Sequence, residues 1–173
     1  INRVRLSKLV NKIYIATGVS SLNDPLVKLL HKEKSINIYR GNDENVLSRF
    51  YAISNIENAD IILRLTGDCP LIDPNIIDDV IKLLIKSNAD YASNILKRTF
   101  PDGCDVEAFT ANTLNKTYLK VIDKYSKEHV TTYMHGMNEL IKKKGKFKKS
   151  SLEHVADFSK LRWTLDEQKD LEF

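Results

Sequence analysis

The chain has 173 residues, of which 42% are hydrophobic and 29% charged, with a formal net charge of +4 at pH 7. The length predicts one domain with its own core, and no apolar run reaches the 18 or so residues of a membrane span. Two cysteines, Cys69 and Cys104, are too few for a zinc site or a disulfide framework, so we expect free thiols in a reduced, cytoplasmic setting.

Much of the positive charge comes from six lysines between residues 142 and 149. Such a run can bind nucleic acid, or it can be a solvated helix end, where cations are favourable. It lacks the aromatic interleaving that single-strand binders use. We therefore favour the solvated helix end and expect no nucleic-acid partner.

Apolar runs of strand length alternate with stretches of helical periodicity along the chain. In chain order we expect a strand at 12–17, a helix from Asp24, a strand at 36–39, a helix at 44–56, a strand at 60–66, a helix from Asp73, short strands at 90–93 and 105–109, helices at 111–123 and 126–144, and late strands at 147–152 and 161–164.

The helix that follows Asp73-Pro74 has the clearest pattern. Asp73 is a typical N-cap and Pro74 suits the first helical turn, while Ile77, Val80, Ile81 and Leu84 repeat with helical spacing. Strand–helix alternation predicts a three-layer, Rossmann-like α/β fold with a mostly parallel sheet, and we place residues 61–65 at its centre. Such sheets bind ligands beyond the carboxyl ends of their strands.

Asp68 comes at such a strand end, directly after the buried run 60–66 and Gly67, a residue that permits a tight turn. A carboxylate in this place suits Mg²⁺ held together with substrate phosphates. Alternatively, Asp68 caps a turn. The residues alone leave these two interpretations open.

Five segments carry the most specific pattern, and their order matters more than any one of them. They are residues 40–51 (RGNDENVLSRFY), 66–74 (TGDCPLIDP), 100–107 (FPDGCDVE), 127–131 (KEHVT) and 161–167 (LRWTLDE). Together they resemble the CMP-sugar synthetase superfamily, and more narrowly the spore-coat polysaccharide branch of the acylneuraminate-type cytidylyltransferases.

The resemblance implies a nucleotide-diphospho-sugar transferase fold and a reaction in which CTP and a sugar give a CMP-sugar and pyrophosphate, for surface polysaccharide or glycan synthesis. It also implies Mg²⁺ as cofactor, held jointly by the catalytic residues Asp68 and Asp166. Without the resemblance, Asp166 is better explained as the N-cap of a helix that begins at Glu167. Homodimers are common in this family, and the predicted helix at 126–144 could form the interface.

Further site residues are expected near the nucleotide and the sugar. The resemblance places Arg49, Thr66 and Gly67 at the nucleotide, although Arg49 could instead extend along the surface. If Asp105 and Glu107 share a strand face, they could bind sugar hydroxyls, an amine or a second metal ion, or simply face water. His129, expected in the first turn of a helix and therefore neutral, could bind the sugar or serve as a cap.

One departure from the family affects the expected activity. Its nucleotide loop, rich in Gly, Ser, Arg and Lys, is absent, and its place would be just before Ile1. We therefore expect residues 1–173 to be a single nucleotidyltransferase domain without its N-terminal strand and loop, with little activity of its own.

Two other classes of protein remain compatible with the sequence. A glycosyltransferase of similar fold would use Asp68 to bind the metal of a nucleotide-sugar. A non-catalytic α/β module would show no metal-dependent affinity for nucleotides.

Overall fold

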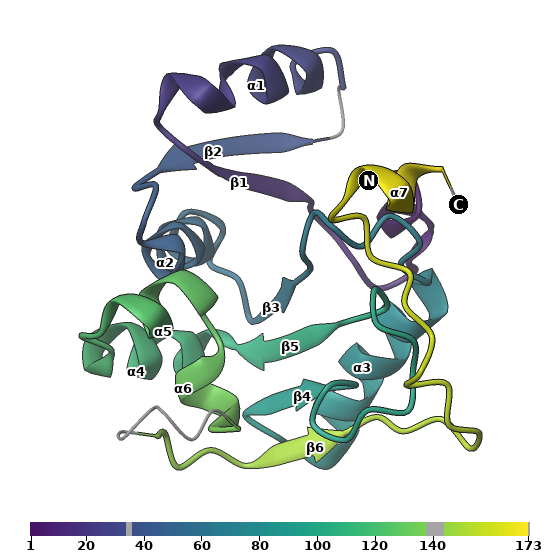
Figure 1. Cartoon of the computed structure of the whole chain (residues 1–173). Helices are drawn as coiled ribbons and strands as arrows, with labels where there is room; N and C mark the ends of the chain where they lie inside the picture. The colour runs from purple at the N-terminus through teal and green to yellow at the C-terminus, as the bar shows by residue number, and fades with distance from the viewer. Residues whose placement is uncertain (34–35, 138–143, 173) are drawn as a thin grey trace. The chain divides into compact units, whose positions relative to one another are not determined.

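The computed structural model describes residues 1–33, 36–137 and 144–172, and the chain forms two compact units. Unit 1 comprises Ile1–Val10, Ile61–Thr110 and Phe147–Phe173, and unit 2 comprises Asn11–Asp60 and Ala111–Lys146. The α/β class expected from the alternation of elements is confirmed (Figure 1). No helix in the described part of the chain is long and apolar enough to cross a membrane.

Unit 1 contains a four-stranded sheet covered by one long helix (Figure 1). The strand order is β3 (Ile61–Arg64), β5 (Glu107–Thr110), β4 (Tyr91–Ser93) and β6 (Lys149–Ser151). Strand β5 runs antiparallel to both of its neighbours, whereas β4 and β6 are parallel. The other elements of this unit are helix α3 (Pro74–Ser87), the 3₁₀ turn η1 (Val4–Leu6) and the short helix α7 (Gln168–Leu171).

Helix α3 follows the sequence expectation closely. The Asp73 side chain accepts a hydrogen bond from the Asn75 amide, and Asn88 ends the helix in the left-handed conformation. Its predicted apolar face is buried against Ala92 of β4, Ala108 of β5 and Val106, which directly precedes β5. In this face Ile77, Val80, Ile81 and Leu84 are at most 6% exposed. Burying each of these large side chains contributes roughly 1.5–3 kcal/mol, so α3 and the sheet form the core of unit 1.

Two expectations for this unit are wrong. The segment at 61–65 does not lie at the centre of the sheet, because among the described residues β3 pairs with β5 alone and forms an edge. Its apolar run is accounted for by packing, since Ile61, Leu63 and Leu65 lie against the α3 core. The late strand expected at 161–164 is reduced to a single bridge between Asp102 and Arg162.

Unit 2 pairs two parallel strands, β1 (Tyr14–Gly18) and β2 (Asn37–Gly41), with helices on both sides (Figure 1). Helix α2 (Val46–Glu57) packs against both strands and against α4 and α5. The N-cap of α2 is Asn45, and its last turn ends at Asn58 in the left-handed conformation. The remaining elements are η2 (Ser21–Asn23), α1 (Asp24–Leu30), α4 (Ala111–Lys120), α5 (Lys124–His129) and α6 (Thr132–His135).

The helix expected at 126–144 is interrupted at Val130. This residue has φ 55° and ψ −59°, and the Thr131 amide donates to the His129 carbonyl at 2.5 Å, which makes a γ-turn between α5 and α6. A β-branched residue with positive φ is strained, but Val130 is fully buried. Val130 therefore fits the apolar pattern of a continuous helix, although the helix is interrupted there. The 138–143 part of the expected helix lies outside the described residues, as do Lys142 and Lys143.

Candidate active site

Two other segments of unit 1 are joined by backbone hydrogen bonds to the segment that contains Asp166. The Asp102 amide donates to the Leu161 carbonyl at 2.9 Å, and the Trp163 amide donates back to the Asp102 carbonyl at 2.7 Å. Two residues later, the Leu165 amide donates to the Asp68 carbonyl at 2.8 Å. Backbone bonds thus join residues 161–166 to the turn at 101–103 and to the turn that holds Asp68.

Gly67 and Asp68 form an open turn beyond the end of β3. Gly67 does not have a positive φ, and a methyl group added to it would meet no atom within 4 Å. The expected tight turn is present, since the Cys69 amide donates to the Thr66 carbonyl at 3.4 Å, but its backbone conformation does not require glycine at position 67. Asp68 is half-buried, and no cation pairs with its carboxylate among the described residues.

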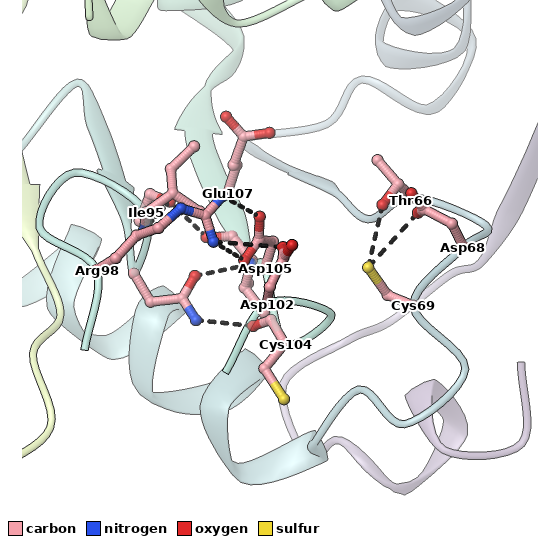
Figure 2. A network of polar contacts seen from close by, with 12 residues as sticks. Thr66, Asp68, Cys69, Ile95, Arg98, Asp102, Cys104, Asp105 and Glu107 are labelled. Carbon is pink, nitrogen blue, oxygen red and sulfur yellow. Dashed lines mark hydrogen bonds and ion pairs between the residues drawn. The ribbon is translucent and has the colours of Figure 1, made fainter. Parts of the chain in front are cut away.

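Cys69 lies beneath this open turn and contacts both of its polar side chains (Figure 2). Its Sγ lies 3.2 Å from the Thr66 hydroxyl and 3.5 Å from Asp68 Oδ1. Burial raises the pKa of the Cys69 thiol to about 11, so the thiol stays protonated and donates to the carboxylate. Cys69 and Cys104 are both free and buried, which confirms the expectation that they form no disulfide.

Asp166 directly follows Leu165, whose amide donates to the Asp68 carbonyl, and the Asp166 carboxylate accepts from Arg162 Nη2 at 2.7 Å. Its side chain is 49% exposed. The alternative role as helix N-cap is wrong, because Glu167 and Asp170 form the capping box of α7. Arg162 also pairs with Asp170, whose pKa its hydrogen bonds lower strongly.

Asp105 and Glu107 do not present a shared strand face. Asp105 precedes β5 and makes two hydrogen bonds with Arg98, at 3.0 and 2.8 Å, while Asp102 shares the same guanidinium (Figure 2). Burial raises the pKa of Asp105 more than Arg98 lowers it. Glu107 is buried, and it accepts from the Tyr91 hydroxyl at 2.7 Å and from Arg64 Nη1.

The sequence interpretation missed the basic partners of these acids. Arg64, Arg98 and Arg162 each hold one or more candidate carboxylates. Arg162 lies within the segment at 161–167 and Arg64 two residues before the segment at 66–74, so their positions were a usable signal. Arg98 had no such signal, because its pairing with Asp105 depends on a loop conformation.

The two remaining candidates, Arg49 and His129, lie in unit 2. Arg49 is 8% exposed rather than extended along the surface, and it donates to the Ala16 carbonyl at 2.8 Å. Burial lowers its pKa, an effect that the Asp43 charge opposes. His129 is the last residue of α5 rather than a first-turn residue, so the helix-dipole argument for a neutral imidazole does not apply. Its ring packs on Tyr125 at 4.2 Å between centroids.

The donor set near Asp68 suits a cation that brings ligands of its own. Among the described residues, no group of three or more His, Cys, Asp or Glu side chains could hold a metal. Mg²⁺ does not require such a cage, because it uses one or two carboxylates and completes its shell with phosphate oxygens and water. Asp68, whose carboxylate has no cation partner among the described residues, and Asp166, which pairs with Arg162, are the two residues that could hold a nucleotide-bound Mg²⁺.

Comparison with known proteins links this arrangement to a family. A family model described as Cytidylyltransferase matches residues 1–171. Uncharacterized protein MJ1063 of Methanocaldococcus jannaschii is 35% identical over 144 residues, which cover 82% of this chain and 57% of that protein. Spore coat polysaccharide biosynthesis protein SpsF of Bacillus subtilis is 32% identical over 139 residues, covering 78% and 56%. The chain thus spans little more than half the length of these relatives.

Solved structures agree with the fold. A cytidylyltransferase from Leptospira borgpetersenii superposes with a TM-score of 0.88 at 31% identity, over 99% of this chain and 70% of that one. A CMP:2-keto-3-deoxy-manno-octonic acid synthetase complexed with CTP gives a TM-score of 0.62 at 13% identity, over 99% and 82%, and so supports the fold alone. These neighbours confirm the fold expected of a nucleotide-diphospho-sugar transferase. Because the family model spans nearly the whole chain, the protein belongs to the cytidylyltransferase family.

Proposed function

We propose that the protein transfers CMP from CTP to a sugar, releasing pyrophosphate, and that the product serves surface polysaccharide synthesis. The observation that carries this proposal is the placement of Asp68 and Asp166. One backbone hydrogen bond, from the Leu165 amide to the Asp68 carbonyl, joins the two segments. Asp68, unlike Asp105, Glu107 and Asp166, is not already paired with an arginine among the described residues.

In this reaction the sugar hydroxyl attacks the α-phosphorus and a new P–O bond forms. The bond from the α-phosphorus to the α–β bridging oxygen breaks, pyrophosphate leaves with the electron pair of that bond, and the hydroxyl proton passes to solvent. The protein mainly positions the reactants and balances their charge. Asp68 and Asp166 would hold Mg²⁺, which when bound draws charge from the phosphates. Thr66 and Gly67 would lie beside the nucleotide, where the open space over Gly67 leaves room.

Several features are proposed on narrower support. Arg49 remains proposed to bind the nucleotide and His129 to bind the sugar. Free Cys69 and Cys104 support a reduced, cytoplasmic setting.

A homodimer is supported by the exposed apolar side chains of Leu119, Ile122 and Tyr125. Sedimentation at several protein concentrations would test the dimer.

The main test is Mg²⁺-dependent binding of CTP, measured by titration calorimetry on the wild type, Asp68→Asn, Asp166→Asn and the double variant. Each single change removes one negative charge and keeps the side-chain shape. We expect the gain in CTP affinity on adding Mg²⁺ to fall about tenfold or more for each, the scale of a hydrogen bond to a charged group. The double variant should lose little more, because both residues act on one ion.

Asp79→Asn is the matched control, because Asp79 is an exposed acid of α3 whose one ion-pair partner in the described part of the chain is Lys82. It should leave Mg²⁺-dependent CTP binding unchanged. Unaltered affinity in Asp68→Asn would refute the shared-metal assignment. Metal-dependent binding of a UDP-sugar with no binding of CTP would favour a glycosyltransferase instead.

A further inference from the structure

Arg64 and Glu107 form a cross-strand pair at the carboxyl end of β3, four residues before Asp68. They are directly opposite each other in the β3–β5 register. The Glu107 carboxylate is used completely, since one oxygen accepts from Arg64 Nη1 and the other from the Tyr91 hydroxyl. A carboxylate that is buried and accepts two hydrogen bonds is poorly placed to bind sugar hydroxyls, which was one of the roles expected for it.

Only part of the Arg64 guanidinium is engaged in hydrogen bonds within the described residues. Nη1 donates to Glu107, and within the described residues Nε and Nη2 have no partner. The side chain is 21% exposed, and neither nitrogen is among the buried unpartnered atoms, so both reach solvent. This contrasts with Arg98 and Arg162, whose guanidinium groups each hold two carboxylates.

The free nitrogens have a specific geometry. In a guanidinium, the Nε–H and Nη2–H bonds are parallel and form one edge, and such an edge binds two oxygens of a carboxylate or phosphate. Glu107 fixes the opposite side of the group, and Tyr91, which is fully buried, fixes Glu107 in turn. The guanidinium is therefore held in one orientation before any ligand arrives, which reduces the entropic cost of binding.

We propose that Arg64 binds an oxyanion of the substrate through its Nε–Nη2 edge, with Glu107 and Tyr91 as positioning residues. This inference rests on the proposed function, because it extends the site around Asp68. The shared chemistry is a planar or tetrahedral oxyanion, which is either a phosphate of the nucleotide or a carboxylate of the sugar.

The alternative is that Arg64 and Glu107 are only a structural ion pair, so the test separates binding from stability. Arg64→Lys keeps a positive charge opposite Glu107 and loses the bidentate edge. We expect its thermal stability to stay close to that of the wild type and its oxyanion affinity to fall about tenfold. Arg5→Lys, the same change at an exposed arginine of unit 1, is the matched control.

A second variant guards against loss of folding. Arg64→Met combined with Glu107→Gln removes both charges together, and the new side-chain amide oxygen at position 107 can still accept from the buried Tyr91 hydroxyl. This variant should remain folded and should lose the oxyanion affinity as well. Its near-wild-type melting temperature together with retained affinity would overturn the proposal.

Two probes distinguish the sources of the oxyanion. Pyrophosphate tests the phosphate, while N-acetylneuraminate, compared with its methyl ester, tests the carboxylate. A Kd that rises about tenfold in Arg64→Lys for pyrophosphate alone assigns a phosphate, and a rise for the sugar acid alone assigns a carboxylate. If neither Kd changes while the melting temperature falls, Arg64 is structural and the proposal is wrong.

The outcome is separable from that of the proposed function. Should the chain bind CTP with Mg²⁺ while no oxyanion affinity depends on Arg64, only the oxyanion site fails. Should a probe bind through Arg64 while CTP does not bind, the oxyanion site stands and the cytidylyltransferase proposal fails.

Discussion

Two turns of unit 1 have similar sequences, Gly67-Asp68-Cys69 and Gly103-Cys104-Asp105, and opposite structural roles. Gly103 has φ 99°, and a methyl group there would lie 2.6 Å from the Trp163 carbonyl carbon. Gly67 has open space around it. Asp105 pairs with Arg98, whereas Asp68 has no cation partner among the described residues. The packed turn maintains the site, and the open turn leaves a carboxylate and free volume for ligands.

The largest effect is expected at the packed turn. Gly103→Ala forces a side chain into the positive-φ region and against the backbone of Trp163 and Thr164. We expect the free energy of unfolding to fall by about 3 kcal/mol, the upper end of the cost of such backbone strain. Urea unfolding followed by circular dichroism would measure this. A loss below about 1 kcal/mol would mean that the 161–166 segment moves aside easily.

The same pair of turns shows what sequence can predict. Both glycines carry the same turn signal, and only the structure shows that one is required by its φ and its neighbours. Features that depend on a few neighbouring residues were predicted correctly, such as the Asp73 N-cap and the buried face of α3. The edge position of β3, the break at Val130 and the arginine pairs depend on contacts between distant segments, which periodicity and capping rules do not encode.

The reactivity of Cys69 tests whether its thiol is buried and hydrogen-bonded next to the turn at Gly67 and Asp68. Burial raises the pKa of Cys69 to about 11, so at pH 8 this residue has roughly a hundredfold less thiolate than an ordinary thiol. In a Cys104→Ser variant, which leaves Cys69 as the only thiol, alkylation by iodoacetamide should therefore be about a hundredfold slower in the native protein than in urea. Equal rates would show that Cys69 is neither buried nor hydrogen-bonded as described.

The smallest effect on stability is expected at Gly67, and this variant sharpens the comparison most directly. Gly67→Ala makes the same chemical change as Gly103→Ala, but in a turn without positive φ and without a neighbour within 4 Å. Because alanine restricts the unfolded chain more than glycine does, the free energy of unfolding should stay constant or rise by up to about 1 kcal/mol.

If the nucleotide occupies the space above the turn, the methyl group added by Gly67→Ala should nevertheless weaken CTP binding several-fold. Calorimetric titration with CTP and Mg²⁺, beside urea unfolding of the same variant, separates the two quantities. A stability loss like that of Gly103→Ala would show that both turns are packed alike. Unchanged CTP affinity at unchanged stability would remove Gly67 from the nucleotide site and leave Thr66 and Asp68 as the candidate residues of this turn.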